Sequence, residues 1–502
     1  MAVFDLLPSS LVTTLLIYSL IVIFLLYVFV GLGGKSQLNY PPGPTPLPVI
    51  GNLHQLDLKR LYKSLVELSE KYGSVYSVRL GPEKVVVLAG YNTVRNALIN
   101  YADEFLGRPD VPIMNVLKEG SGVVWSNGEP WKQMRRFTLS TLRDFGMGKR
   151  SIEDKIIEEA GFLMEKIRSF KGQPFDTDVI INFATANIIC SIVFGDRFEY
   201  DDTTFLTIGN LVHESFRLLG SPMVQVYNAY PFLSFLPGSH KEICTHFTKL
   251  KMCLKDIIEA KHKEMNENDI RSFIDTYIKK QKEESGNPGT YFHEKNLLIT
   301  TSDLFIAGMG TTATTIRWAM YIMIKYPDIQ KRVQEEVDRV IGSERSVRME
   351  DRRHMPYTDA VIHEVQRFAN IAPLGIPRTT TVDINFQGYF IPKGTYIIPL
   401  LASVLYDKTQ WEKPEVFNPG HFLDASGKFV KRDAFIPFST GRRICPGETL
   451  AKVELFLFFV TLLQKFDLVA LQGAELDLAP VVGGILNPKP HRLRAVARQQ
   501  RC

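Results

Sequence analysis

The longest run of apolar positions in the chain lies near its start. Residues 11–32 carry no charged side chain and meet the ~20 residues that a helix needs to span a bilayer. A cleaved secretory signal would have an apolar core of only ~7 to 15 residues after a positive segment, whereas here Asp5 precedes the run and no lysine or arginine does. We predict a transmembrane anchor over residues 1–32.

A proline-rich stretch follows this run. Five prolines between Tyr40 and Asn52 fix φ and remove backbone donors, so the stretch can form neither a helix nor a central strand. We predict a stiff hinge over residues 33–52 and one large domain over residues 53–502. The first basic residues after the anchor are Lys35, Lys59 and Arg60, so the positive-inside rule puts the large domain in the cytoplasm.

The periodicity of the large domain is mostly helical. Strand patterns occur over residues 73–90 and again over residues 388–404, where Gly394 marks a turn, and helical periodicity runs over residues 152–170 and 241–265. Residues 281–290 form the clearest surface loop. The pattern predicts a mainly α fold with small β-sheets.

A second long apolar run covers Leu297–Ile324 and would form a helix of roughly 40 Å. Asp303 and Arg317 lie within it, and each would cost about 2.5–3.5 kcal/mol near the centre of a bilayer. Four threonines between Thr311 and Thr315 add further polarity. We therefore predict a helix buried in protein rather than a second membrane span.

Composition narrows the function classes. The 502 residues are 45% hydrophobic and 23% charged, as in folded proteins, and the net charge of +5 contains no long basic run. Nucleic-acid binding is therefore excluded. The five cysteines, Cys190, Cys244, Cys253, Cys445 and Cys502, form no C-x-x-C pair, which argues against a disulfide framework and a zinc site.

Cys445 stands in a setting that favours chemistry. A free cysteine is commonly a small buried hydrophobe, but Gly441 and Gly447 flank this one and a helix pattern opens at Glu448. A sulfur at a helix N-terminus is expected to have a lowered pKa and to bind metal as a thiolate. Because no second cysteine is near, the sulfur could only be one axial ligand to a metal held mainly by something else, and haem fits this requirement.

The residues around Cys445 carry a resemblance. Phe438, Gly441, Arg443, Cys445 and Gly447 match every fixed position of F-x-x-G-x-R-x-C-x-G, and the chain resembles the cytochromes P-450. Together with the anchor and the hinge, RDAFIPFSTGRRICPGE and FNPGHFLD look most like family 2 of the microsomal enzymes. The resemblance implies the cytochrome P-450 fold, a haem b cofactor and a single-pass endoplasmic reticulum protein whose catalytic domain, residues 53–502, faces the cytoplasm.

The resemblance also implies roles for residues far from Cys445. Glu364 and Arg367 match the E-x-x-R pair that holds the proximal core together, although three residues apart they could be a surface ion pair. The residues expected to bind the haem propionates are Arg108, Trp131, Arg135, Arg378 and Arg443. Trp131 and Arg135 could instead be a cation stacked on a ring. His421 stands where many relatives have arginine.

The implied activity is a monooxygenase that inserts one oxygen atom from O₂ into a lipophilic small molecule such as a xenobiotic, fatty acid or steroid. No G-x-G-x-x-G motif in a strand–helix context occurs, so electrons come from outside: the resemblance implies NADPH–cytochrome reductase, with cytochrome b5 as a second candidate. A basic cluster could steer such an acidic partner or be a solvated face. Its members are Lys132, Arg136, Lys431, Arg432 and Arg442.

Thr311 is the expected catalytic partner of Cys445, as a hydroxyl that relays protons. Relatives usually carry an acid just before this threonine, where this chain has Gly310. We expect Thr311→Ala to raise the fraction of NADPH lost to peroxide, and Gly310→Glu, if it folds, to lower it. Asp303 and Ala307 are candidate pocket residues, and Asp303 could bind nearby backbone or attract a basic substrate nitrogen. The alternatives are an oxygen-independent isomerase of the same fold and a haem sensor or carrier.

Substrate identity is not determined by the sequence beyond an apolar ligand. The segments expected to contact substrate are residues 112–123, 205–221, 304–311, 371–376 and 481–486, which are mostly apolar. Residues 227–238 are apolar enough to touch a bilayer surface, with core packing as the alternative.

Overall fold

The computed structural model describes residues 9–32 and 39–498. Residues 1–8 of the predicted anchor and 33–38 of the predicted hinge lie outside the described residues. The α-helices are α1 (Ser9–Leu32), α2 (Leu61–Tyr72), α3 (Tyr91–Arg95), α4 (Pro112–Lys118), α5 (Gly128–Asp144), α6 (Arg150–Ser169), α7 (Thr177–Val193), α8 (Thr203–Leu219), α9 (Pro222–Ala229), α10 (Ser239–Glu264), α11 (Phe273–Glu283), α12 (Glu294–Lys325), α13 (Pro327–Val340), α14 (Pro356–Ala369), α15 (Ala402–Leu405) and α16 (Glu448–Lys465).

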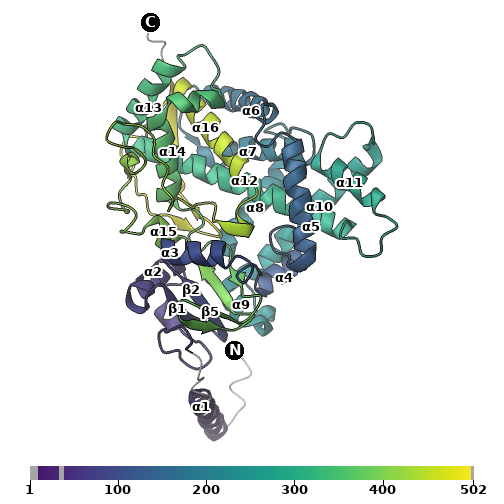
Figure 1. Cartoon of the computed structure of the whole chain (residues 1–502), viewed down its shortest axis with the longest axis vertical. Helices are drawn as coiled ribbons and strands as arrows, with labels where there is room; N and C mark the ends of the chain where they lie inside the picture. The colour runs from purple at the N-terminus through teal and green to yellow at the C-terminus, as the bar shows by residue number, and fades with distance from the viewer. Residues whose placement is uncertain (1–8, 33–38, 499–502) are drawn as a thin grey trace.

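The strands are short. They are β1 (Val75–Leu80), β2 (Glu83–Leu88), β3 (Phe175–Asp176), β4 (Arg378–Thr379), β5 (Ile384–Phe386), β6 (Tyr389–Ile391), β7 (Tyr396–Pro399), β8 (Phe466–Ala470), β9 (Val481–Val482), β10 (Leu486–Asn487) and β11 (Arg492–Ala497). The largest sheet has the order β1-β2-β7-β4, and the others have two or three strands. Figure 1 shows this sheet, with α2 and α3, below a larger helical body. The predicted mainly α fold with small sheets is confirmed.

The predicted anchor coincides with α1, whose large side chains such as Leu15, Leu16 and Phe24 are exposed. Within the residues that the structure describes, however, no helix proves both long and apolar enough to cross a membrane. The anchor over residues 1–32 therefore stays a prediction.

The described part of the hinge lies along the sheet. Pro42 accepts from the backbone N–H of Ser77 at 2.7 Å, and the Ser77 hydroxyl donates to Pro41 at 2.8 Å. The side chain of Asn52 donates to the carbonyls of Pro44 and Thr45. The Ser77 bonds fasten this segment to β1, and the Asn52 bonds hold its two ends together. The proline-rich carbonyls thereby gain the donors that they need.

Helix α12 is the axis of the helical body, and it packs against α7, α10, α14 and α16. Figure 1 shows it passing between α7, α14 and α16. Arg317, which argued against a membrane span, is buried and pairs with Asp178 of α7 at 2.8 Å. The prediction of a long helix buried in protein is confirmed.

Two local predictions needed correction. Residues 388–404 form β6, a turn at Gly394 with φ +79° and β7, but the last residues of the stretch enter α15 instead of continuing the strand. The predicted loop over residues 281–290 loses its first three residues to α11, which ends at Glu283. Gln281, Lys282 and Glu283 are good helix formers and extend α11. Residues 402–405 are buried where α15 packs against α2 and α3, a contact that the local pattern does not show.

Candidate functional site

The loop before α16 holds Cys445 in a fixed position. The 3₁₀ turn Gly441–Arg443 begins at Gly441, whose φ is +75°. A side chain there would collide with the backbone carbonyl of Leu98, so only glycine fits. The Cys445 N–H then donates to the carbonyl of Phe438 at 3.1 Å. Pro446 and Gly447 follow, and α16 begins at Glu448.

The predicted lowering of the pKa of Cys445 is wrong in net direction. Burial raises the pKa of the thiol, and the backbone N–H groups of Gly447 and Glu448 and the Arg135 guanidinium only partly oppose it. Yet Cys445 is exposed by surface area. A side chain that opens onto an internal space surrounded by protein shows both properties. A metal ion at the sulfur would favour the thiolate outright.

Four arginines predicted to act together are brought together by four different elements. Arg108 precedes α4, Arg135 lies on α5, Arg378 on β4 and Arg443 in the 3₁₀ turn before Cys445. Arg108, Arg378 and Arg443 are each at most 7% exposed, and Arg135 is half-buried. Arg135 donates to the carbonyl of Ile444, next to Cys445, at 2.5 Å. The cluster therefore adjoins the cysteine loop.

The arginine cluster carries uncompensated positive charge. Burial, and then the positive charges of Arg378 and Arg135, lower the pKa of Arg443 to about 9. Burial and Arg135 lower the pKa of Arg378 to about 9. None of the ion pairs described for the chain involves a member of the cluster, and the Nε and Nη1 atoms of Arg378 and Nη1 of Arg443 have no hydrogen-bond partner. Buried cations with unpaired donors are stabilised when an anionic ligand binds to them.

Two aromatic residues complete the cluster. The Arg443 guanidinium lies 3.9 Å from the centre of the Trp131 ring, and that of Arg135 lies 5.9 Å from it. Trp125 was not predicted as a site residue, but the centre of its ring lies 5.8 Å from the Arg108 guanidinium. The indole N–H groups of both tryptophans are buried without a partner. In the sequence, the indication that Trp125 belongs to the same cluster was its short distance along the chain from Trp131.

Glu364 and Arg367 are not a surface pair. Both are 0% exposed, and Arg367 donates to the two carboxylate oxygens of Glu364 at 2.7 and 2.8 Å. Arg367 also donates to the carbonyls of Leu405 and Pro414. The geometry ties α14 to the chain segment that precedes Cys445, as the resemblance implied.

The sequence predicted no role for His421, which contacts this buried pair. Its Nδ1 lies 3.1 Å from both oxygens of Glu364, and its Nε2 lies 2.6 Å from the carbonyl of Glu412. The backbone N–H of Asn418 also donates to Glu364. The indication in the sequence was a histidine at a position where many relatives have arginine, a residue that can also pair with a buried carboxylate.

The predicted pocket residues of α12 lie on one face. Ala307 is exposed and Thr311 half-buried, although both belong to a helix that is buried at most positions. Residues four apart share a helix face, so this face opens onto space inside the protein. The Thr311 hydroxyl donates to the carbonyl of Ala307 at 2.8 Å, and Thr311 O accepts from Thr315.

The structure explains Gly310. A Cβ at this position would lie 2.9 Å from the ring of Phe216, which belongs to α8, and a Cβ at Gly484 would lie 3.2 Å from the same ring. Phe216 thus fills the volume that an acid before Thr311 would occupy. Gly310→Glu is therefore expected to displace Phe216 rather than to supply protons, which corrects the expectation drawn from the sequence.

Asp303 is engaged by protein on both oxygens. It pairs with Lys118 at 2.8 Å and accepts from the backbone N–H groups of Val123 and Val124. Of the two roles considered for Asp303, the backbone one is observed, and its buried carboxylate is not free to attract a basic substrate nitrogen. It fastens α12 to the segment after α4.

Comparison with known proteins agrees with this geometry. Residues 41–494 match the family model "Cytochrome P450". The chain is 48% identical to cytochrome P450 2K1 of Oncorhynchus mykiss over 502 residues, which cover 98% of the chain and 99% of the relative. It is 49% identical to cytochrome P450 2K6 of Danio rerio over 90% of each chain, and 47% identical to cytochrome P450 2C39 of Mus musculus over 91% and 94%.

The chain belongs to the cytochrome P450 family and is similar to its family 2 members. It is a cytochrome P450 monooxygenase with haem as cofactor. The residues present fit that cofactor, because the orphaned guanidinium and indole N–H groups match the two carboxylates of its propionates.

Proposed function

We propose that Cys445 supplies the axial thiolate to haem b and that Arg108, Trp131, Arg135, Arg378 and Arg443 bind its propionates. The observation that carries this assignment is the buried arginine cluster, whose members repel one another and leave donors unpaired beside the cysteine loop. Two carboxylates would supply both the missing charge and the missing acceptors. Phe438 and Gly441 shape the loop that presents the sulfur.

Haem with a thiolate ligand, when bound, activates O₂ by favouring O–O cleavage. The protein contributes groups that hold protons and exclude water. Thr311 is the proposed proton-relaying group, because its hydroxyl lies on the open face of α12 and can exchange its hydrogen bond to Ala307 O for one to water. Phe216, packed against Gly310, narrows the space beside that hydroxyl.

The proposed substrates are lipophilic small molecules: xenobiotics, fatty acids or steroids. Phe216 supports this, since it joins three of the segments predicted to contact substrate. It belongs to residues 205–221, it packs on Gly310 of residues 304–311, and its carbonyl accepts from Gly484 of residues 481–486 at 2.5 Å. A wall of this kind selects ligands by shape and apolar area.

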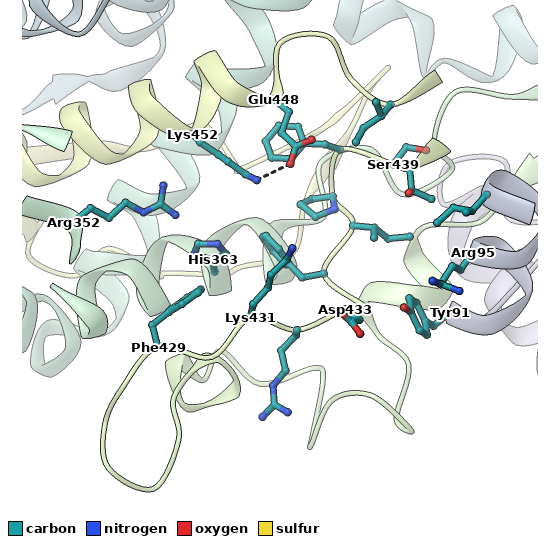
Figure 2. Close-up of a pocket in the computed structure, with 18 residues that line it drawn as sticks. Tyr91, Arg95, Arg352, His363, Phe429, Lys431, Asp433, Ser439, Glu448 and Lys452 are labelled. Atoms are coloured by element: carbon teal, nitrogen blue, oxygen red, sulfur yellow. Dashed lines mark hydrogen bonds and ion pairs between the residues drawn. The ribbon is translucent and has the colours of Figure 1, made fainter. Parts of the chain in front are cut away.

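The proposed electron donor is NADPH–cytochrome reductase, with cytochrome b5 as a second one. A groove of about 590 Å³ lies against the cysteine loop, since Phe438, Ile444 and Glu448 line it. Five basic side chains also line it, against the acids Asp433 and Glu448: Arg95, Arg352, Lys431, Arg432 and Lys452. Figure 2 shows Lys431 and Arg95 at this groove, with Lys452 bonded to Glu448.

The predicted docking cluster is thereby revised. Lys431 and Arg432 line the groove, whereas Lys132, which pairs with Glu129, and Arg442, which pairs with Asp103, are not among its lining residues. An acidic partner would be steered mainly by the groove residues.

The proposed location is the endoplasmic reticulum membrane, with residues 1–32 as a single-pass anchor and the catalytic domain in the cytoplasm. A second contact supports it: Phe232 and Phe235 are 72% and 69% exposed, so core packing does not account for them. Tyr230 donates to the carbonyl of Val49, which is itself exposed, so two apolar segments lie together. Removing residues 1–32 should leave residual vesicle binding, which Phe232→Ser with Phe235→Ser should abolish.

Reconstitution with reductase tests the proposed activity. The haem-loaded protein should consume NADPH and O₂ in the presence of apolar test substrates, and its reduced carbon-monoxide complex should show the thiolate spectrum, which Cys445→Ser should remove. Thr311→Ala should raise the fraction of NADPH lost to peroxide severalfold. Turnover without O₂ and reductase would identify an isomerase, and stable haem binding without turnover would identify a carrier.

A further inference from the structure

Asn127 stands at the N-cap of α5, yet its side chain does not cap that helix. Its backbone is extended, with φ −123° and ψ 169°, and its carbonyl accepts from the N–H of Trp131 at 3.4 Å. An N-cap asparagine usually accepts from a backbone N–H two or three residues further on. The residue three further on is Pro130, which has no N–H. The side chain of Asn127 makes other contacts instead.

The side-chain amide of Asn127 binds both backbone polar groups of Arg108. Its Oδ1 accepts from the Arg108 N–H at 2.7 Å, and its Nδ2 donates to the Arg108 carbonyl at 3.0 Å. The same Oδ1 accepts from Nη2 of Arg443 at 3.3 Å. An amide can do this because it carries an acceptor and a donor together. Asn127 thus joins two arginines that come from separate parts of the chain.

The three residues just before it hold the same two arginines. The carbonyl of Val124 accepts from Nε of Arg108 at 2.9 Å, and the centre of the Trp125 ring lies 5.8 Å from that guanidinium group. The carbonyl of Ser126 accepts from Nη2 of Arg443 at 2.9 Å. Every residue of this short segment therefore contacts one of the two arginines, and Asn127 contacts both.

The acceptors that the described residues offer to the two guanidinium groups are all neutral. They are the Asn127 amide and the backbone carbonyls of Leu106, Val124, Ser126, Ile376 and Pro377. Neutral acceptors orient a guanidinium group but leave its positive charge in place. Arg443 also keeps its Nη1 without a partner. An aspartate in place of Asn127 would instead compensate part of the charge that an anionic ligand binds.

We propose that Asn127 is a positioning residue of the cofactor site: a neutral bridge that fixes the backbone of Arg108 and the guanidinium group of Arg443 in one frame and leaves their charge to the haem propionates. The proposal rests on the proposed role of these arginines as propionate ligands. Asn127 acts through the two arginines and needs no contact with the cofactor. Donors that are already held in place lose less conformational entropy when a carboxylate binds them.

Asn127→Ser tests the bridge. Serine is a good N-cap residue, so a gained cap on α5 should offset the lost bonds to Arg108. The urea midpoint of the haem-free variant should then stay close to that of wild type. A hydroxyl cannot replace the amide between Arg108 and Arg443, so transfer of haem to an acceptor protein should be about tenfold faster. Haem release at the wild-type rate overturns the proposal.

Asn127→Asp distinguishes positioning from a structural role, because its effects on stability and on cofactor binding should have opposite signs. The carboxylate still accepts from both arginines and relieves their repulsion, so the haem-free variant should unfold at a higher urea concentration than wild type. The added charge competes with the propionates, so haem release should be about tenfold faster. It should also make the reduction potential of the bound haem more negative.

The matched control for this charge change is Asn210→Asp, at an exposed position on α8. It should leave the urea midpoint, the rate of haem release and the reduction potential at their wild-type values. A structural role of Asn127 would move stability and haem retention in the same direction. Haem that leaves Asn127→Asp no faster than it leaves wild type therefore contradicts the proposal.

A double-variant cycle shows whether Asn127 acts through Arg443. Asn127→Ser should accelerate haem release by a smaller factor in the Arg443→Gln background than in wild type, because one of the groups that it holds is gone. Equal factors in both backgrounds contradict the proposal. If Arg443→Gln itself releases haem at the wild-type rate, the proposed propionate site fails. If Arg443→Gln releases haem faster and Asn127→Ser does not, only the role of Asn127 fails.

Discussion

Two buried clusters of charge lie in this protein, and they are built in opposite ways. Glu364, Arg367 and His421 satisfy one another, and the remaining donors of Arg367 reach backbone carbonyls. The arginine cluster around Arg443 holds like charges with orphaned donors and no acid among the described residues that pairs with it. The first cluster needs nothing from outside. The second is complete only with an anionic ligand.

Whether a buried charge has a partner within the chain distinguishes a structural cluster from a ligand-binding cluster better than burial alone does. Burying a charge costs several kcal/mol unless a partner repays the loss of water. In the Glu364 cluster the chain itself supplies the partner, so folding alone keeps the pair together. In the arginine cluster the chain supplies no such partner, and a bound anionic ligand would remove the cost.

Removing one member of the Glu364 cluster should lower the stability of the protein more than the other changes do. Glu364→Ala leaves Arg367 buried and unpaired, so we expect a loss of about 3–5 kcal/mol in the free energy of unfolding. Urea titration of the haem-loaded protein measures it. The double variant Glu364→Leu with Arg367→Leu should lose less than Glu364→Ala alone. A single variant as stable as wild type would show that the pair contributes nothing.

Breaking the arginine cluster should leave the fold intact and weaken cofactor binding. Arg443→Gln should accelerate haem release about 30-fold, because one propionate loses a charged donor. The haem-free protein should be as stable as wild type or more stable, since repulsion is relieved. Transfer of haem to an acceptor protein and urea titration of the haem-free form measure the two effects, and Arg432→Gln in the groove is the control. A destabilised haem-free protein with unchanged haem release would reverse the assignment.

His421 offers a smaller test of the first cluster. His421→Leu removes two polar contacts from a buried site but leaves the Glu364–Arg367 pair in place. We expect a loss of about 1–2 kcal/mol in the free energy of unfolding, with no change in haem release. If His421→Leu releases haem faster while its unfolding midpoint stays the same, the two clusters are not independent.

The basic groove extends the contrast to exposed charge. Lys431 and Arg432 are exposed, so reversing their charge should affect stability little. Lys431→Glu with Arg432→Glu should raise the apparent Michaelis constant for reductase by about three- to tenfold at low ionic strength, and the effect should shrink as salt screens it. Lys132→Glu with Arg136→Glu, outside the groove lining, should have a smaller effect. Equal effects of both pairs would place docking elsewhere.

Much of the site was readable from the sequence because the cysteine loop is local. The glycine at 441 and the spacing from Phe438 to Gly447 predict a sulfur before a helix, and the positive φ of Gly441 belongs to the loop itself. The close approach of the Leu98 carbonyl, which also excludes a side chain at 441, appears only in the folded chain. Distant residues were harder to assign. Nothing in the neighbourhood of Trp125 or His421 along the chain states what they contact, and both were missed.

Apolar periodicity along the chain was enough to predict the mainly helical body and the buried helix α12, and the residues around Cys445 were enough to predict a haem cofactor. Which distant groups share an environment became evident only in the folded chain. Phe216 packs against Gly310, and Asp303 pairs with Lys118. The physical reason is that periodicity depends on neighbours along one helix, whereas desolvation and steric exclusion depend on elements that meet only when the chain is folded.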